Sequence, residues 1–183
     1  IRTEELLNSH LPNILENIPW KKSMKWGDYS MFWGRPLKSI LAIFNGKPLN
    51  FKYHHLICSN VTYLDKDFEE KLIRFKDFKS YMSYFKNRGI IINNNLRRNF
   101  IEKELIKSSS KKNLKVYINE KLLSEVTDIV EKPKVILCSF DKKFLEIPKE
   151  ILVVTMQKHQ KYFPTFDKKE NLTNIFFIIA DIK

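Results

Sequence analysis

Apolar residues at helical spacing mark the first predicted element of the chain. In residues 3–19, TEELLNSHLPNILENIP, leucines and isoleucines recur three or four positions apart behind a Thr and two acids. This pattern predicts an amphipathic helix with Thr3 as its N-cap. Because proline lacks a backbone N–H, we expect Pro12 to kink or divide the helix and Pro19 to end it.

The same spacing, together with capping residues, predicts four further helices. They are expected within residues 77–89, 93–113, 119–133 and 147–160. Asp77 is the N-cap candidate of the first of these helices. One face of that helix carries an aromatic stripe that is expected to be part of a hydrophobic core. The stripe consists of Phe78, Tyr81, Tyr84 and Phe85.

Short apolar runs between turn residues predict the strands. Asn45-Gly46 lies between two apolar runs and predicts a hairpin. Residues 134–141 are typical of a buried strand, and residues 161–182 of two strands joined by a polar turn. Helices and strands mix without a βαβ rhythm, so the expected class is α+β, with a mixed or antiparallel sheet and hairpins packed against several short helices. We expect one module over 1–183, with a subdivision near 107–114 left open.

The charge of the chain changes the range of expected partners. Lys and Arg number 33 against 21 acids, a net charge of +12, which suits a polyanion through counterion release and electrostatic steering. The excess is mostly lysine, and a compositional bias of an AT-rich genome is the competing explanation. No run of about 18 apolar residues occurs, so no membrane partner is expected. The chain starts at Ile1, and we expect it to be a fragment of a longer protein.

The sequence contains no short catalytic or nucleotide-binding motif of the GxGxxG, GxxxxGK[ST], HExxH or GxSxG type. His54 and His55 are adjacent in a strand-like run, so their side chains are expected on opposite faces and no metal site is predicted. Cys58 and Cys138 lie far apart without a CxxC pattern, and we expect two reduced thiols that are at least partly buried. No catalytic residue is predicted.

Several motifs, in a fixed order, carry a family resemblance. They are LLSEVTDIVEKP (122–133), FLEIPKE (144–150), MQKHQKYF (156–163) and, upstream, MKWGDYSMFWGRPL (24–37). Together they resemble the N-terminal half of the β subunit of bacterial-type glycyl-tRNA synthetase. The chain departs from the family pattern at Lys25, Lys132 and Asp181, and residues 63–66 stand where the family usually has Gly-His-Arg.

The resemblance implies a non-catalytic tRNA-binding and assembly segment that supports attachment of glycine to its tRNA. It also implies a cytoplasmic α2β2 heterotetramer whose α subunit binds ATP, glycine and magnesium and forms the adenylate. The fragment alone is then expected to be inactive and to bind no cofactor. A generic RNA-binding module and a structural protein-interaction domain remain alternatives.

The candidate tRNA contacts come from two basic motifs and one Arg-Pro pair. In QKHQKYF, cations are expected in the last turn of a helix, where they complement the helix dipole, so a purely structural corner is an equal alternative. Adjacent arginines early in a helix suit phosphate oxygens, although a solvated face is as good an explanation. The candidates are Arg35, Arg97, Arg98, Lys158, His159, Lys161 and Tyr162, with Gln160 beside them.

Overall fold

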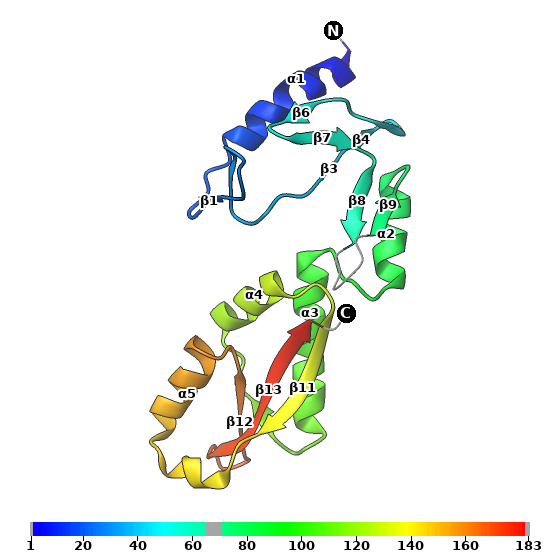
Figure 1. Ribbon diagram of the computed structural model, residues 1–183. Helices are drawn as coiled ribbons and strands as arrows, with labels where there is room; N and C mark the ends of the chain where they lie inside the picture. The colour runs from blue at the N-terminus through cyan, green and yellow to red at the C-terminus, as the bar shows by residue number, and fades with distance from the viewer. Residues whose placement is uncertain (1, 65–70, 182–183) are drawn as a thin grey trace. The chain divides into compact units, whose positions relative to one another are not determined.

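The computed structural model describes residues 2–64 and 71–181, which form two compact units (Figure 1). The first unit is Ile1–Tyr84 and the second is Phe85–Lys183. Five α-helices and several small antiparallel or mixed sheets in the described part confirm the α+β class. The division falls between residues 84 and 85, whereas residues 107–114 lie inside the second unit. Within the described ranges, no helix is both long and apolar enough to cross a membrane.

Helix α1 (Thr3–Glu16) covers the core of the first unit. Its partly buried Leu7, Leu11 and Leu15 pack against a cluster of buried residues. That cluster consists of Met31, Leu49, Phe51, Tyr53 and Cys58. The expectation that Thr3 caps the helix and that Pro12 divides it is corrected: Arg2 is the N-cap and Pro12 lies inside one continuous helix.

The strands of the first unit are short. In the largest sheet, β7 (Leu56–Ser59) pairs in parallel with β3 (Ile40–Leu41) and antiparallel with β6 (Lys52–Tyr53). The other pairs are antiparallel: β1 (Met24–Lys25) with β2 (Phe32–Trp33), β4 (Ile43–Phe44) with β5 (Lys47–Pro48), and β8 (Val61–Leu64) with β9 (Lys71–Arg74). The β4–β5 hairpin confirms the Asn45-Gly46 prediction, since both residues have the positive φ, 49° and 75°, that the two-residue turn requires.

Helix α2 (Phe78–Asn87) begins after Asp77, whose carboxylate accepts a hydrogen bond of 2.7 Å from the Ser80 backbone N–H. This bond confirms Asp77 as a cap, and it is the largest cause of the lowered pKa of Asp77. The aromatic stripe is only partly a core. Tyr81 and Tyr84 pack edge-on against buried Phe75, but Phe78 is 74% exposed because it lies on the solvent side of the first turn.

The second unit contains one four-stranded antiparallel sheet in the order β10-β12-β13-β11. Its strands are β10 (Lys115–Val116), β12 (Phe163–Phe166), β13 (Leu172–Asp181) and β11 (Pro133–Ser139). Helices α3 (Asn94–Ser110) and α4 (Glu120–Ile129) pack their apolar faces against it, while the 3-10 turn η1 (Lys142–Glu146) and α5 (Lys149–Lys158) follow β11. The core contains Ile101, Leu105, Leu123, Val126, Phe163 and Phe177.

Asparagine caps explain where two of these helices start. The side chains of Asn93 and Asn119 each accept a hydrogen bond of 3.0 Å, from the backbone N–H of Leu96 and of Leu122. The helix predicted over 119–133 ends earlier than expected, at Ile129. Pro133 is the first residue of β11 and does not close the helix.

Candidate nucleic-acid interface

The turn that follows α5 gathers polar side chains in a tight reversal of the chain. The backbone N–H groups of His159 and Gln160 both donate to the Thr155 carbonyl, at 3.1 and 3.3 Å. Lys161 then has a φ of 61°, and the Tyr162 N–H donates to the Met156 carbonyl at 2.8 Å. This ending satisfies the last carbonyls of the helix and directs the chain into β12.

Two side chains of this turn interact with the protein itself. The Lys161 ammonium lies 2.8 Å from one carboxylate oxygen of Glu125 on α4 and 2.9 Å from the other. The Tyr162 ring stacks on Phe176 of β13, with centroids 4.6 Å apart and planes at 22°. Lys161 is therefore partly neutralised, and one face of Tyr162 is already covered.

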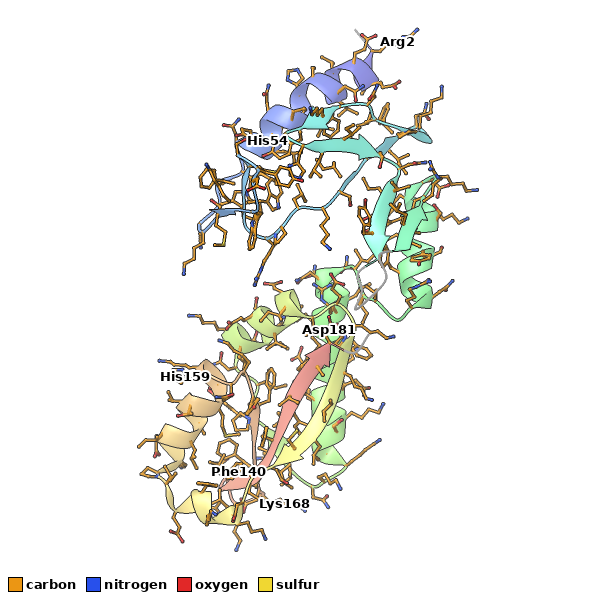
Figure 2. The ribbon with its side chains drawn as sticks, in the orientation of Figure 1. Arg2, His54, Phe140, His159, Lys168 and Asp181 are labelled. Carbon is orange, nitrogen blue, oxygen red and sulfur yellow. The ribbon has the colours of Figure 1, made fainter. Side chains whose placement is uncertain are left out.

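Lys158, His159 and Gln160 remain on the outside of the turn, all exposed. His159 projects from the end of α5 (Figure 2). Among the residues that the structure describes, neither Lys158 nor His159 has a side-chain hydrogen bond or ion pair. Both positions are thus open to a ligand, and Lys158 contributes a mobile positive charge there.

The two adjacent arginines of α3 have different environments. Arg97 is buried, with 9% exposure, and its Nε donates to the Thr127 carbonyl at 2.8 Å. Its Nη1 donates to the carbonyls of Ile91 and Ile92. The expectation that Arg97 contacts a phosphate is therefore corrected to a structural role, because its guanidinium is committed to backbone carbonyls of this protein.

Arg98 is half-buried and forms ion pairs on the surface of the second unit. Its guanidinium contacts the carboxylate of Glu120 and lies 3.8 Å from that of Glu102, four residues along α3. A phosphate contact by Arg98 would require exchange of these partners, which is possible because surface ion pairs contribute little free energy. It stays a weaker candidate than Lys158.

Arg35 is the candidate in the first unit. It is exposed and stands between Gly34 and Pro36 in the loop that leads to β3. The predicted contacts are thus divided between the two units, with Arg35 in one and the α5 turn in the other.

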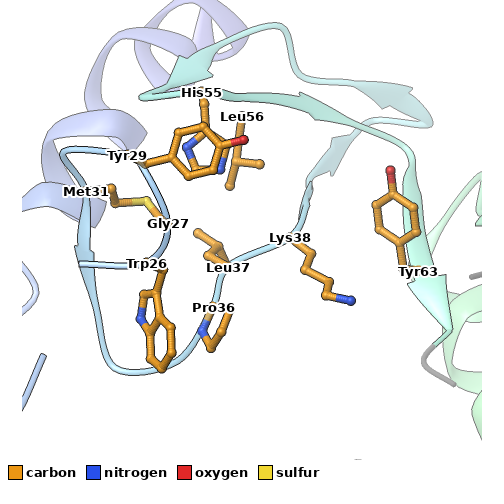
Figure 3. A pocket seen from close by; sticks show the side chains of 10 residues that line it. All are labelled: Trp26, Gly27, Tyr29, Met31, Pro36, Leu37, Lys38, His55, Leu56 and Tyr63. Carbon is orange, nitrogen blue, oxygen red and sulfur yellow. The ribbon is translucent and has the colours of Figure 1, made fainter. Parts of the chain in front are cut away.

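Next to Arg35 lies a pocket of about 490 Å³ that no sequence motif predicted (Figure 3). Its walls carry Tyr29 stacked on His55, with ring centroids 3.4 Å apart and planes 7° from parallel. The full lining is Trp26, Gly27, Tyr29, Met31, Pro36, Leu37, Lys38, His55, Leu56 and Tyr63. The available signal was the interleaving of aromatic and basic residues in 20–38, a composition typical of nucleic-acid binding.

Glu16, His54 and Ser30 form a short polar chain elsewhere in the first unit. His54 Nε2 lies 2.9 Å from a carboxylate oxygen of Glu16, and Nδ1 lies 3.5 Å from the Ser30 hydroxyl. Nε2 must donate, because an ionised carboxylate only accepts. The pKa of Glu16 is lowered by the hydrogen bond from His54 and then by that of Tyr53. Burial of the phenol and, to a smaller extent, its hydrogen bond to Glu16 raise the pKa of Tyr53 to about 12.

The contact between Glu16 and His54, here called the Glu16–His54 clamp, joins the end of α1 to the turn between β6 and β7. The serine–histidine distance is at the outer limit of a hydrogen bond, and Ser30 is exposed to water. We therefore assign it no nucleophilic role. In the described ranges, no group of three or more His, Cys, Asp or Glu side chains is placed to hold a metal ion.

The two cysteines are free thiols, Cys58 buried and Cys138 partly buried, which confirms the expected burial. Burial raises the pKa of the Cys58 thiol, so the protonated form of that thiol is favoured at neutral pH.

The family resemblance agrees with comparisons to known proteins. A family model described as "Glycyl-tRNA synthetase beta subunit" matches residues 1–183. Among curated proteins, the chain is 34% identical over 178 residues to the glycine–tRNA ligase beta subunit of Rickettsia akari, covering 97% of this chain and 27% of that protein.

Similar proteins also occur outside that genus. The glycine–tRNA ligase beta subunit of Dictyoglomus turgidum is 34% identical over 181 residues, which cover 99% of this chain and 26% of the relative. The chain thus spans about a quarter of the length of the curated relatives that it matches. Because the family model covers the whole sequence, the chain belongs to the glycyl-tRNA synthetase beta subunit family.

Proposed function

We propose that this chain is a tRNA-binding and assembly segment of the β subunit of an α2β2 glycyl-tRNA synthetase. The observation that carries the proposal is the match to the β-subunit family over all 183 residues. The exposed cation at the end of α5 and the net charge of +12 support an RNA partner. In this role the segment supports attachment of glycine to its tRNA in the cytoplasm.

The chemistry is proposed to take place in the α subunit. That subunit would bind ATP, glycine and magnesium and form glycyl-adenylate. This assignment agrees with a sequence that has none of the short motifs that cradle nucleotide phosphates. The residues of the present chain would bind and orient the tRNA.

Phosphate contacts are the proposed mode of binding at the α5 turn. A lysine ammonium is a compact charge on a flexible stem, so it positions a backbone phosphate without reading a base. Lys158 is the first candidate, His159 adds a polar contact, and Lys161 takes part only if Glu125 releases it. Arg35 is the proposed contact of the first unit.

Charging of glycine tRNA tests the proposal directly. The α subunit is combined with full-length β or with β lacking residues 1–183, and the charging rate is measured over a range of tRNA concentrations. We expect the deletion to raise the tRNA concentration needed for half-maximal charging. Glycine-dependent pyrophosphate exchange by the α subunit should persist, and the isolated chain should show none. Unchanged charging curves would contradict the proposal.

An assembly role has an observation of its own. The segment from η1 to the middle of α5 exposes several large apolar side chains, each at least 36% accessible. They are Phe144, Leu145, Ile147, Ile151 and Val154. Exposed apolar residues that lie close together are typical of protein contact surfaces, so this segment is the candidate for one. Sedimentation of α with the β deletion separates the roles, because loss of the complex indicates assembly and retention with weaker tRNA binding indicates recognition.

A further inference from the structure

The pocket of the first unit presents an aromatic face to solvent. Tyr29 is 50% exposed although His55 stacks on one side of its ring. The opposite side is therefore accessible. Trp26 and Pro36 stand together on another wall of the pocket (Figure 3). An open ring face beside apolar walls suits a flat aromatic ligand.

Local contacts hold these walls in place before any ligand arrives. The Trp26 indole N–H donates to the Trp33 carbonyl at 3.0 Å, across the β1–β2 pair. Gly27 follows with a φ of 61°, a conformation that favours glycine and lets the chain turn under Tyr29. A stacking platform that is already ordered costs little conformational entropy on binding.

The charge around the pocket indicates a ligand that carries phosphate. Residues 20–38, which supply most of the lining, contain five Lys or Arg and one acid, Asp28. Lys38 is part of the lining, and Arg35 directly precedes the lining residue Pro36. Basic groups around an aromatic platform are the combination that binds single-stranded nucleic acid.

One polar atom in the pocket wall is unsatisfied. His55 Nδ1 is buried and has no hydrogen-bond partner in the part of the chain that the structure describes. An unpaired buried nitrogen is unfavourable. The Tyr29 ring separates this nitrogen from the open ring face, so a base stacked on that face is recognised through the ring and not through His55.

We propose that this pocket binds one unpaired nucleobase of RNA, stacked on the open face of Tyr29, with a flanking phosphate held by Lys38 and Arg35. The inference rests on the proposed RNA-binding function and adds a base contact to the phosphate contacts of the α5 turn. The volume of about 490 Å³ lies within the range of small-ligand sites. A paired base in a duplex does not fit, because both of its faces are stacked.

The test compares two short single-stranded RNAs that differ only in one central residue, a normal nucleotide or an abasic one. Fluorescence anisotropy of labelled strands measures their affinity for the purified chain. We expect the intact strand to bind about 10-fold more tightly. Tyr29→Ala should remove this difference, whereas Tyr29→Phe, which keeps the ring, should preserve it. Tyr117→Ala is the matched control, since Tyr117 is 48% exposed and lies in the other unit.

The outcomes separate this inference from the function on which it rests. Equal affinity for both strands, with normal tRNA binding, overturns the base contact and leaves the phosphate contacts standing. An intact-strand preference that survives Tyr29→Ala overturns the assignment to this pocket. Absence of any RNA or tRNA binding at low salt overturns both the base contact and the RNA-binding function. That result is the one expected if the pocket binds a side chain of a partner protein instead of a base.

Discussion

Arg97 and Arg98 are neighbours in sequence, yet the structure gives them different roles. A pair of arginines at the start of a helix predicts phosphate binding equally well at both positions. The burial of Arg97 depends on carbonyls at residues 91, 92 and 127. No local sequence pattern predicts that these three carbonyls meet at the Arg97 guanidinium. Likewise, the stack of Tyr29 on His55 joins residues 26 positions apart and could not be read from either segment alone.

Replacement of Arg97 tests its structural role. Arg97→Ala leaves three buried or partly buried carbonyls without their donor, so we expect a loss of about 3 kcal/mol in the free energy of unfolding. Arg98→Ala, the control, should cost less than about 1 kcal/mol because its ion pairs are at the surface. Urea denaturation measures both values. Weaker RNA binding by a fully stable Arg97→Ala protein would restore the original phosphate assignment.

The Glu16–His54 clamp makes a prediction about acid. The folded-state pKa of Glu16 is lowered, so its contribution to stability is present above the ordinary value of 4.5 and is lost as the pH falls through the lowered value. Thermal unfolding of the wild type and of Glu16→Gln should therefore differ at neutral pH and converge in acid. A difference that stays constant down to the most acidic pH would exclude the carboxylate as its source.

At the scale of elements, local signals predicted starts and turns better than ends and exposure. Asp77 and the Asn45-Gly46 turn have their predicted roles because a cap and a two-residue hairpin depend on neighbouring backbone only. Pro12 lies inside α1, and Phe78 faces water. Both outcomes are set by tertiary packing: leucines hold α1 against the core along its length, and Tyr81 and Tyr84 of the aromatic stripe pack on buried Phe75 while Phe78 does not enter the core.

The turn after α5 gives a prediction about salt. Lys158→Ala removes one cation that faces water, so tRNA affinity should fall about equally for all tRNAs and the slope of log affinity against log salt should decrease by about one. Lys103→Ala, also an exposed lysine of the second unit, is the control. The charging rate at saturating tRNA should change little. If both variants keep the wild-type slope, the turn is a structural corner and the phosphate contact lies elsewhere.

At the scale of the whole molecule, the class and the family were accessible from the sequence, whereas the division into units was not. The family motifs are spread over both units. They therefore relate the whole chain to one family and do not mark the boundary between the units. The Ser/Lys stretch near 107–114 has the composition of a linker. It ends α3 instead, and its Ser109 is buried with its hydroxyl bonded to the Ile106 carbonyl.

Each unit has a hydrophobic core of its own, and the two cores share no residue, so we predict two unfolding transitions. One core is built around Phe51 and Tyr53 in the first unit, and the other around Leu123 and Phe163 in the second. Leu123→Ala should destabilise its own unit by about 2–5 kcal/mol through the lost contacts and the cavity that remains. Calorimetry should then show one transition shifted and the other unchanged, and Phe51→Ala should shift the opposite one. A single transition that both variants shift together would mean that residues 1–183 unfold as one cooperative module, as the sequence first suggested.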